Sequence, residues 1–413
     1  MNLANILFKG DKVVWVIFLL LCLISIVEVF SATSTLTYKD GDYWGPILRH
    51  ASFLFGGALL ILVIHNIPCR FFSLFGFLLP VSAVLLGVTI LFGVEINDSN
   101  RWMNLFGVRF QPSEIAKLSC IVYVAFLLSR RKMFTDKQIF NWILIGISVI
   151  CALILLENFS TAMILFVVCF LMMVIGWVSP KSIAILFLVM VLLGASFFFL
   201  LHTLPDDMVN KSNLLEKIKN RTEKMFKGTP PLDAKTYKID DYNRQETHAK
   251  IAIANGGLTG KLPGLGQQRD TLPQAYSDFI YAIIIEEMGI FVGFFVLFLY
   301  IALMIRVGVI ARRCDTLFPK YLVLGCGLMI VVQALTNMAV VAGLFPVTGQ
   351  PLPLVSRGGT STVITCVYFA VILSVSRFGA GMGNEEEEEE EEEMEEVEEE
   401  NVIEVETPIE TPV

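Results

Sequence analysis

Long apolar segments separated by short polar ones make up most of this chain of 413 residues. A helix needs about 20 apolar residues to cross a hydrocarbon core of about 30 Å, and ten segments approach or exceed that length. They lie at 13–32, 48–67, 71–94, 112–129, 139–156, 159–178, 182–202, 278–305, 320–342 and 358–377. Because no run alternates as membrane strands do, the pattern predicts an all-α polytopic membrane protein with about ten transmembrane helices.

Composition supports the same class, because 55% of the residues are hydrophobic and only 17% are charged. The first apolar run is too long for the core of a cleavable signal peptide, so we interpret it as the first span. Lysines and arginines gather on one side of the predicted spans, as at 130–132, which predicts that both termini are cytoplasmic. The loops 95–111, 203–277 and 343–357 are then expected outside.

Two regions differ in composition. Residues 1–380 are interpreted as a single transmembrane domain, whose largest loop, 203–277, is extracytoplasmic and lies between spans 7 and 8. Residues 381–413 are rich in glutamate, give the net charge of -8 its sign, and are expected to form a disordered acidic cytoplasmic tail. Such a tail either only solvates the chain end or docks on a basic cytoplasmic partner.

The first candidate for chemistry is Asp278, in the segment LPQAYSDFIYAIIIEEMG (272–289). Ser277 before it is a helix-capping residue type, so Asp278 is expected in the first helical turn, where the dipole favours a carboxylate. An ionised carboxylate at an outward-facing helix start can accept a proton from a substrate hydroxyl. The alternative is that Asp278 only caps the helix.

Two further acids, Glu286 and Glu287, lie about two turns deeper in the same predicted span. A carboxylate in hydrocarbon is costly unless it is protonated, paired or beside water. Adjacent helical residues lie about 100° apart, so the two side chains are expected to face different ways, one of them toward a basic partner. A structural polar network is favoured, and a proton or ion pathway is the alternative.

The segment RWMNLFGVRFQPSEIAKL (101–118) holds a second group of charges. Proline suits a first helical turn, so a helix is expected to begin at Pro112. Glu114 and Lys117 are three residues apart, hence on one face, and can pair. Arg101, Arg109 and Lys117 place cations near the outer surface, where they suit a phosphate. The alternative is that the two arginines are ordinary loop charges.

The third segment, GLFPVTGQPLPLVSRGGTS (343–361), is too rich in proline and glycine for a regular helix. At membrane depth such backbone is tolerated only where protein or a wet cavity covers it. Ser356 and Arg357 open the last span, whose first amides can meet an anion. The four histidines and eight cysteines show no spacing typical of a metal site or a disulfide framework, so the sequence identifies no metal site.

These three segments, in this order, resemble the SEDS family of polytopic FtsW/RodA proteins. The resemblance covers nearly all of residues 10–380, and it rests on RW…QPSEIAK, on P…DFIY…EEMG and on N…GLFPVTGQPLP…SRGGTS. Any one motif is suggestive, and the three together at the expected spans are specific. The stretch LPQAYSDF is closer to the division branch of the family than to the elongation branch.

The resemblance implies a peptidoglycan glycosyltransferase of the bacterial cytoplasmic membrane, which polymerises lipid II at the outer face. It implies a class B penicillin-binding protein as partner, other division-complex proteins at the division site, and no nucleic acid. The catalytic aspartate falls on Asp278, and Glu114 and Lys117 match positions on which family members depend. No cofactor follows with certainty, although Mg²⁺ or Mn²⁺ could assist the leaving pyrophosphate.

Two departures and two alternatives qualify this reading. The family often has P-D-x-G-T where this chain has ENFST (157–161), so the aspartate of that pattern is replaced by Asn158. In the third motif, the aromatic residue usual between Ser and Gly-Gly is replaced by Arg357. One alternative is a lipid II flippase with Glu286, Glu287 and Glu114 as a proton relay. The other is a non-catalytic scaffold for a penicillin-binding protein. The outward placement of Asp278 favours the enzyme.

Overall fold

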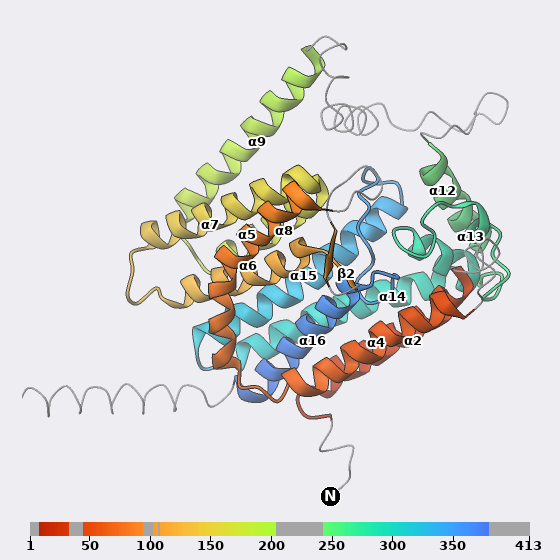
Figure 1. Cartoon of the computed structure of the whole chain (residues 1–413), viewed down its shortest axis with the longest axis horizontal. Helices are drawn as coiled ribbons and strands as arrows, with labels where there is room; N and C mark the ends of the chain where they lie inside the picture. The colour runs from red at the N-terminus through yellow and green to blue at the C-terminus, as the bar shows by residue number, and fades with distance from the viewer. Residues whose placement is uncertain (1–7, 33–43, 94–101, 106–107, 204–242, 380–413) are drawn as a thin grey trace, which may run out of the picture.

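The computed structural model describes residues 8–32, 44–93, 102–105, 108–203 and 243–379. Within these ranges the chain is a bundle of helices (Figure 1). In chain order they are α2 (Lys12–Ala32), α4 (Gly45–Ile64), the 3₁₀ helix η1 (Cys69–Phe77), α5 (Leu78–Phe92), α6 (Pro112–Ser129), α7 (Asp136–Glu157), α8 (Phe159–Ile175), α9 (Pro180–Thr203), α12 (Arg244–Gly256), α13 (Gln268–Thr271), α14 (Ile280–Arg312), α15 (Leu317–Val341) and α16 (Thr360–Phe378).

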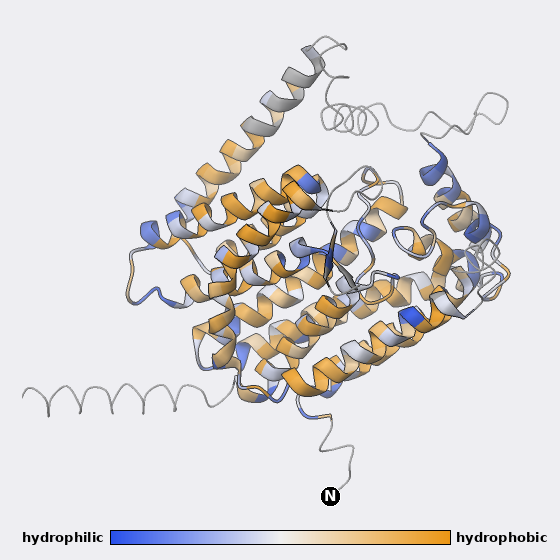
Figure 2. Cartoon of the chain, in the orientation of Figure 1, coloured by the Kyte–Doolittle hydropathy of each residue, from blue (hydrophilic) through white to orange (hydrophobic). Residues whose placement is uncertain are grey.

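The membrane character expected from the sequence is confirmed. Among the described residues, eight helical segments are long and apolar enough to cross a membrane, and Phe159–Ile175 and Pro180–Leu192 are shorter apolar helices. Figure 2 shows apolar residues covering nearly all of these helices, whereas α12 and α13 are largely hydrophilic. The fold is therefore an all-α polytopic membrane protein. The tail 381–413 lies outside the described residues.

The centre of the bundle is formed by α15. This helix packs against α14, α16, α6 and α8, and α6 in turn packs against α5 and α7. The spans of α15 and α6 are the most buried, and those of α5 and α4 are among the least. α14 exposes Phe291, Phe294 and Phe298, as expected for a surface that meets lipid. Figure 1 shows α9 projecting away from the other helices.

Local sequence explains several helix boundaries. α6 begins with Pro112, as predicted, because its missing amide hydrogen would be unpaired in a first turn anyway. α8 begins after Asn158, whose side chain accepts hydrogen bonds from the amides of Ser160 (3.1 Å) and Thr161 (3.4 Å). The residue that departs from the family pattern therefore serves as a helix cap.

Two local features differ from the prediction. The expected span 71–94 starts as the 3₁₀ helix η1 and becomes α-helical only at Leu78. The loop 95–111 contains a hairpin of β1 (Met103–Leu105) and β2 (Val108–Phe110), in which Met103 pairs with Phe110. Alternation over three residues per strand is too short to stand out from neighbouring helical patterns.

Candidate functional site

Asp278 lies in a turn that precedes α14, and not in the first helical turn as predicted. The helix begins at Ile280, because the amides of Ser277 and Phe279 both donate to the carbonyl of Gln274 (3.1 and 3.4 Å) and close the turn first. Ser277 does not cap the helix, because its hydroxyl donates to Asp278 Oδ1 at 2.8 Å. The half-buried carboxylate is thus presented by a turn.

The irregular segment 343–359 packs directly against this turn. Ser356 Oγ donates to the carbonyl of Ser277 (2.5 Å) and accepts from the amide of Leu352 (2.7 Å). A side chain at Gly349 would place its Cβ 3.5 Å from Asp278 Oδ2, so this glycine lies beside the carboxylate. Ser356, predicted to bind substrate, is buried and joins the two segments.

The side-chain amide of Asn337, a buried residue of α15, also holds the backbone of the Asp278 turn. Asn337 Nδ2 donates to the carbonyls of Asp278 and Gln350, both at 2.7 Å. Gln350 Nε2 then donates to Thr161 Oγ1 at 2.8 Å, which links the segment to α8. Asn337 and Gln350 belong to the third motif, N…GLFPVTGQPLP, but were not predicted as site residues. Their signal is an amide within or beside an apolar span, which needs a partner when buried.

Glu114 and Lys117 form the pair that their spacing predicted. Lys117 Nζ lies 2.8 Å from Glu114 Oε1, and the two residues are 1% and 6% exposed. Lys117 Nζ also donates to Gln333 Oε1 at 3.4 Å, and Gln333 Nε2 donates to the carbonyl of Pro351 at 3.0 Å. The pair is therefore connected to the irregular segment that packs on the Asp278 turn.

The other predicted cations are placed less completely. Arg101 lies outside the described residues, and Arg109 is known only by its backbone, which pairs with Asn104 in the hairpin. Arg357 lies beside the Asp278 turn, because its amide donates to the carbonyl of Tyr276 at 3.0 Å.

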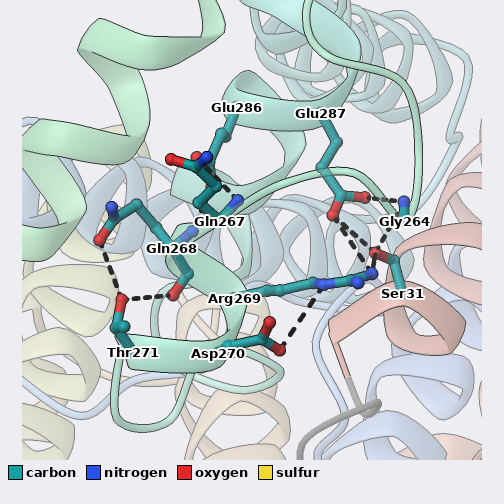
Figure 3. A network of polar contacts seen from close by, with 9 residues as sticks. All are labelled: Ser31, Gly264, Gln267, Gln268, Arg269, Asp270, Thr271, Glu286 and Glu287. Atoms are coloured by element: carbon teal, nitrogen blue, oxygen red, sulfur yellow. Dashed lines mark hydrogen bonds and ion pairs between the residues drawn. The ribbon is translucent and has the colours of Figure 1, made fainter.

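Glu286 and Glu287 are fully buried and accept hydrogen bonds from one loop, as Figure 3 shows. The two oxygens of Glu286 accept from the amides of Gln267 (3.1 Å) and Gln268 (3.0 Å). Those of Glu287 accept from Ser31 Oγ (2.6 Å) and the Gly264 amide (3.0 Å). Both side chains thus accept hydrogen bonds from the same loop, because the loop wraps around this part of the helix.

Each of these two carboxylates also lies near a cation. Lys261 Nζ is 3.7 Å from Glu286 Oε1, and Arg269 Nη1 is 4.0 Å from Glu287 Oε1. Arg269 Nη1 donates to Ser31 Oγ at 3.1 Å as well. The contacts join the loop, α14 and α2, and they are those of a polar network that anchors a loop.

A glycine in α14 makes this loop contact possible. Gly289 has φ 87° and ψ 168°, a conformation open essentially only to glycine, and it interrupts the helix. The backbone of residues 258–260 fills the place where a Cβ would stand. The amide of Ile290 donates to the Gly257 carbonyl (3.1 Å), and the amide of Leu262 donates to the Glu287 carbonyl (2.7 Å).

Substitution Gly289→Ala is expected to destabilise the protein by about 1–3 kcal/mol for the backbone conformation alone, with a further loss from displacement of the loop. Gly308→Ala is the matched control, since nothing lies within 4 Å of a Cβ at that position in the same helix. Thermal unfolding of both variants in one detergent checks this. A Gly289→Ala protein that melts with the control would show that the loop does not depend on close backbone contact.

Another buried acid, Glu28, has no such contacts. Its side chain is 0% exposed, and neither oxygen has a hydrogen-bond partner among the described residues. Glu287 lies near enough to repel a charge on it.

We expect Glu28→Leu to raise the melting temperature, because a buried polar group without a hydrogen bond costs about 1–3 kcal/mol. A lower melting temperature would show that Glu28 makes a contact that stabilises the fold.

Metal ligands were a further question raised by the sequence. In the part of the chain that the structure describes, no group of three or more histidine, cysteine or acidic side chains could hold a metal ion. All eight cysteines are free. The described site thus consists of the Asp278 carboxylate, the Glu114–Lys117 pair, hydroxyls, amides and Arg357.

The fold and this site define a class of protein: a polytopic helical membrane protein with a carboxylate at one end of the bundle, held by irregular backbone. The chain belongs to the FtsW/RodA/SpoVE family of cell cycle proteins, whose profile matches residues 11–380. This confirms the resemblance seen in the sequence.

Relatives of both branches are similar to it. A Bacillus subtilis (strain 168) protein named "probable peptidoglycan glycosyltransferase FtsW" is 30% identical over 376 residues, covering 87% of this chain and 88% of the relative. The Escherichia coli (strain K12) peptidoglycan glycosyltransferase MrdB is 29% identical over 370 residues, covering 88% and 93%.

Solved structures show the same fold. A chain from a peptidoglycan synthase complex, described as coordinating polymerisation and crosslinking, superposes with a TM-score of 0.69 at 21% identity, covering 90% of this chain and 99% of that one. The rod shape determining protein RodA of Thermus thermophilus gives 0.62 at 21% identity, covering 90% and 97%.

Proposed function

We propose that this member of the family, a peptidoglycan glycosyltransferase, polymerises lipid II with Asp278 as the general base. The observation that carries the proposal is the half-buried Asp278 carboxylate in a turn whose backbone is fixed by Asn337 and Ser356. A general base must lie within hydrogen-bond reach of the proton it takes, so the reaction needs a carboxylate whose position is fixed.

In the proposed reaction, Asp278 takes the proton of the 4-hydroxyl of the acceptor sugar. That oxygen attacks the anomeric carbon of the donor with inversion, and the bond to undecaprenyl pyrophosphate breaks. Negative charge then develops on the departing pyrophosphate, where cations stabilise it. Arg101 and Arg109 are proposed for this role.

Lys117 contributes in one of two ways. It can turn toward the pyrophosphate, with Glu114 orienting it, or it can act through Gln333 on the segment beside Asp278. The burial of the pair supports the second way. A divalent cation remains a proposal, and no step depends on it, because the described residues offer no cluster to hold one.

The setting of the enzyme follows from the same proposal. Both termini are cytoplasmic, so the end of the bundle that carries Asp278 faces outward, where lipid II is polymerised. A class B penicillin-binding protein crosslinks the product, which is supported by the similarity to a chain of a synthase complex for polymerisation and crosslinking. The division site and other division-complex proteins stay predictions from LPQAYSDF.

The flippase alternative loses support from the contacts of its supposed relay. Glu286 and Glu287 are occupied by amides of the 257–271 loop, and Glu114 by Lys117. A proton relay would need carboxylates connected to one another and open to both sides of the membrane.

Polymerisation of purified lipid II by the purified chain, alone and with a class B penicillin-binding protein, tests the proposal. Glycan strands longer than the substrate are expected. Transfer of lipid II across vesicle membranes without any polymer would overturn it in favour of a transporter, and stimulation of the partner without either activity would favour a scaffold.

A further inference from the structure

A pair of arginines, Arg357 and Arg49, lies beside the Asp278 turn. The guanidinium of Arg357 lies over the Tyr276 ring, 5.3 Å from its centroid. Burial lowers the pKa of Arg357, the Tyr276 hydroxyl raises it, and nearby Arg49 lowers it again. Neither arginine forms an ion pair with any residue that the structure describes. Two guanidiniums near one another, neither of them ion-paired within the described ranges, favour the binding of an anion.

Helix α4 carries Arg49 and positions it near Arg357. Its next turn carries Phe53, whose ring would lie 3.9 Å from a Cβ at Gly359, so the beginning of α4 lies beside the beginning of α16. His50 Nε2 is 2.8 Å from Ser25 Oγ, which donates to the Val355 carbonyl. His50 Nδ1 is buried and has no hydrogen-bond partner among the described residues.

The first turn of α16 adds donors. The helix follows Gly359, has no side-chain cap, and carries no acidic residue in this turn. Thr362 is 1% exposed, and its hydroxyl has no partner within the described ranges. That hydroxyl would lie 3.6 Å from a Cβ at Gly358, so it points back toward the helix start. A buried hydroxyl without a partner among the described residues and the positive end of a helix together favour an anion.

We propose that Arg49, Arg357 and the first turn of α16 form a subsite for the pyrophosphate of a lipid-linked sugar. The subsite uses other residues than the proposed leaving-group cations Arg101 and Arg109. The inference rests on the proposed function for the identity of its ligand. Polymerisation joins two lipid-linked molecules, of which one keeps its pyrophosphate through the reaction, so the enzyme needs two places for this group.

The position of the subsite suits such a ligand. Arg357 is connected to the Asp278 turn through its amide bond to the Tyr276 carbonyl, so a bound pyrophosphate is held close to the proposed base. α4 exposes Leu48, Phe55 and Leu59 along its length, which gives an apolar tail a surface beside the headgroup. An anionic phospholipid offers similar phosphate chemistry, and the experiment separates the two.

The test measures binding of undecaprenyl pyrophosphate to the full chain in phosphatidylcholine nanodiscs. Arg49→Gln, Arg357→Gln and the double variant are compared with Arg313→Gln, which removes an exposed arginine at the far end of α14. We expect each single variant to raise the Kd at least about tenfold, of the order of one charge-assisted contact. Arg313→Gln should stay within about twofold, and Arg357→Lys should recover part of the loss.

Two readouts keep the outcomes distinct. In polymerisation assays the arginine variants should raise the KM for lipid II while kcat stays within about threefold, which loss of the fold would not produce. Unchanged undecaprenyl pyrophosphate binding in Arg49→Gln and Arg357→Gln overturns the subsite, whether or not the protein polymerises. Arginine-dependent binding in a chain that makes no polymer sustains the subsite and overturns the proposed function. Equally tight, arginine-dependent binding of phosphatidylglycerol overturns the pyrophosphate assignment.

Discussion

Asp278→Asn is expected to abolish polymerisation of lipid II while leaving expression and partner binding intact. Asparagine keeps the shape of the side chain and can still accept the Ser277 hydroxyl bond, but it cannot take a proton. Loss of a positioned general base costs about 10²–10⁴ in rate. The rate of glycan formation by the purified variant, at saturating lipid II, measures this.

The matched control is Asp270→Asn, which removes a half-exposed carboxylate eight positions earlier in the same loop region. It should polymerise within about twofold of the wild type. The backbone of the Asp278 turn is held by Asn337 and Ser356, so Asp278→Asn should also melt close to the wild type. Polymerisation within threefold of the wild type by Asp278→Asn would show that another group is the base.

Lys117→Met is expected to lower the polymerisation rate at least about 10²-fold, the order seen when one charge-stabilising group is removed. The burial of the pair adds a second effect, because the variant leaves the Glu114 carboxylate buried without its cation. Breaking a buried pair in this way costs about 3–5 kcal/mol. Rate and melting temperature should therefore both fall.

The double variant Lys117→Met/Glu114→Gln separates the two effects. It removes both charges, so the melting temperature should recover, while the rate should remain low. The control is Lys250→Met/Glu246→Gln on α12, a partly exposed pair at 2.7 Å that should contribute about 0–1 kcal/mol. If the Lys117 double variant recovers its rate together with its stability, the pair is only a structural bridge.

Lys117 and Asp278 are connected through hydrogen bonds of α15. Gln333 joins Lys117 to the Pro351 carbonyl, and Asn337 joins Gln350 to Asp278. These two amides lie one helical turn apart on α15, the central helix. Because they contact both the pair and the turn, α15 sets the position of the proposed base relative to the cations.

The contacts of Glu286 and Glu287 explain how two acids are accommodated within a membrane span. A carboxylate in a span needs partners, and Glu286 and Glu287 obtain them from the amides of a loop that the Gly289 break admits. Their contribution is to fix the loop that leads from α12 to the Asp278 turn. Glu28, with no such partner among the described residues, shows the opposite case.

The sequence by itself determined the class of fold, the places of the spans and the family. Hydrophobic periodicity and span length are local properties, so they predicted the helices well, including the start of α6 at Pro112 and the pairing of Glu114 with Lys117, three residues apart. The motifs also indicate Asp278 as the candidate base.

Only the tertiary structure decided which hydrogen-bond partners hold the site residues in place. The bond from Lys117 to Gln333 spans 216 positions, and that from Gln350 to Thr161 spans 189, distances at which no local pattern carries information. The turn at Asp278 replaced the expected helix start because its backbone bonds to Gln274 and Asn337 compete with helix formation. Such competition is settled by packing between distant segments, since a buried polar group is costly without a hydrogen bond and takes whichever partner the fold supplies.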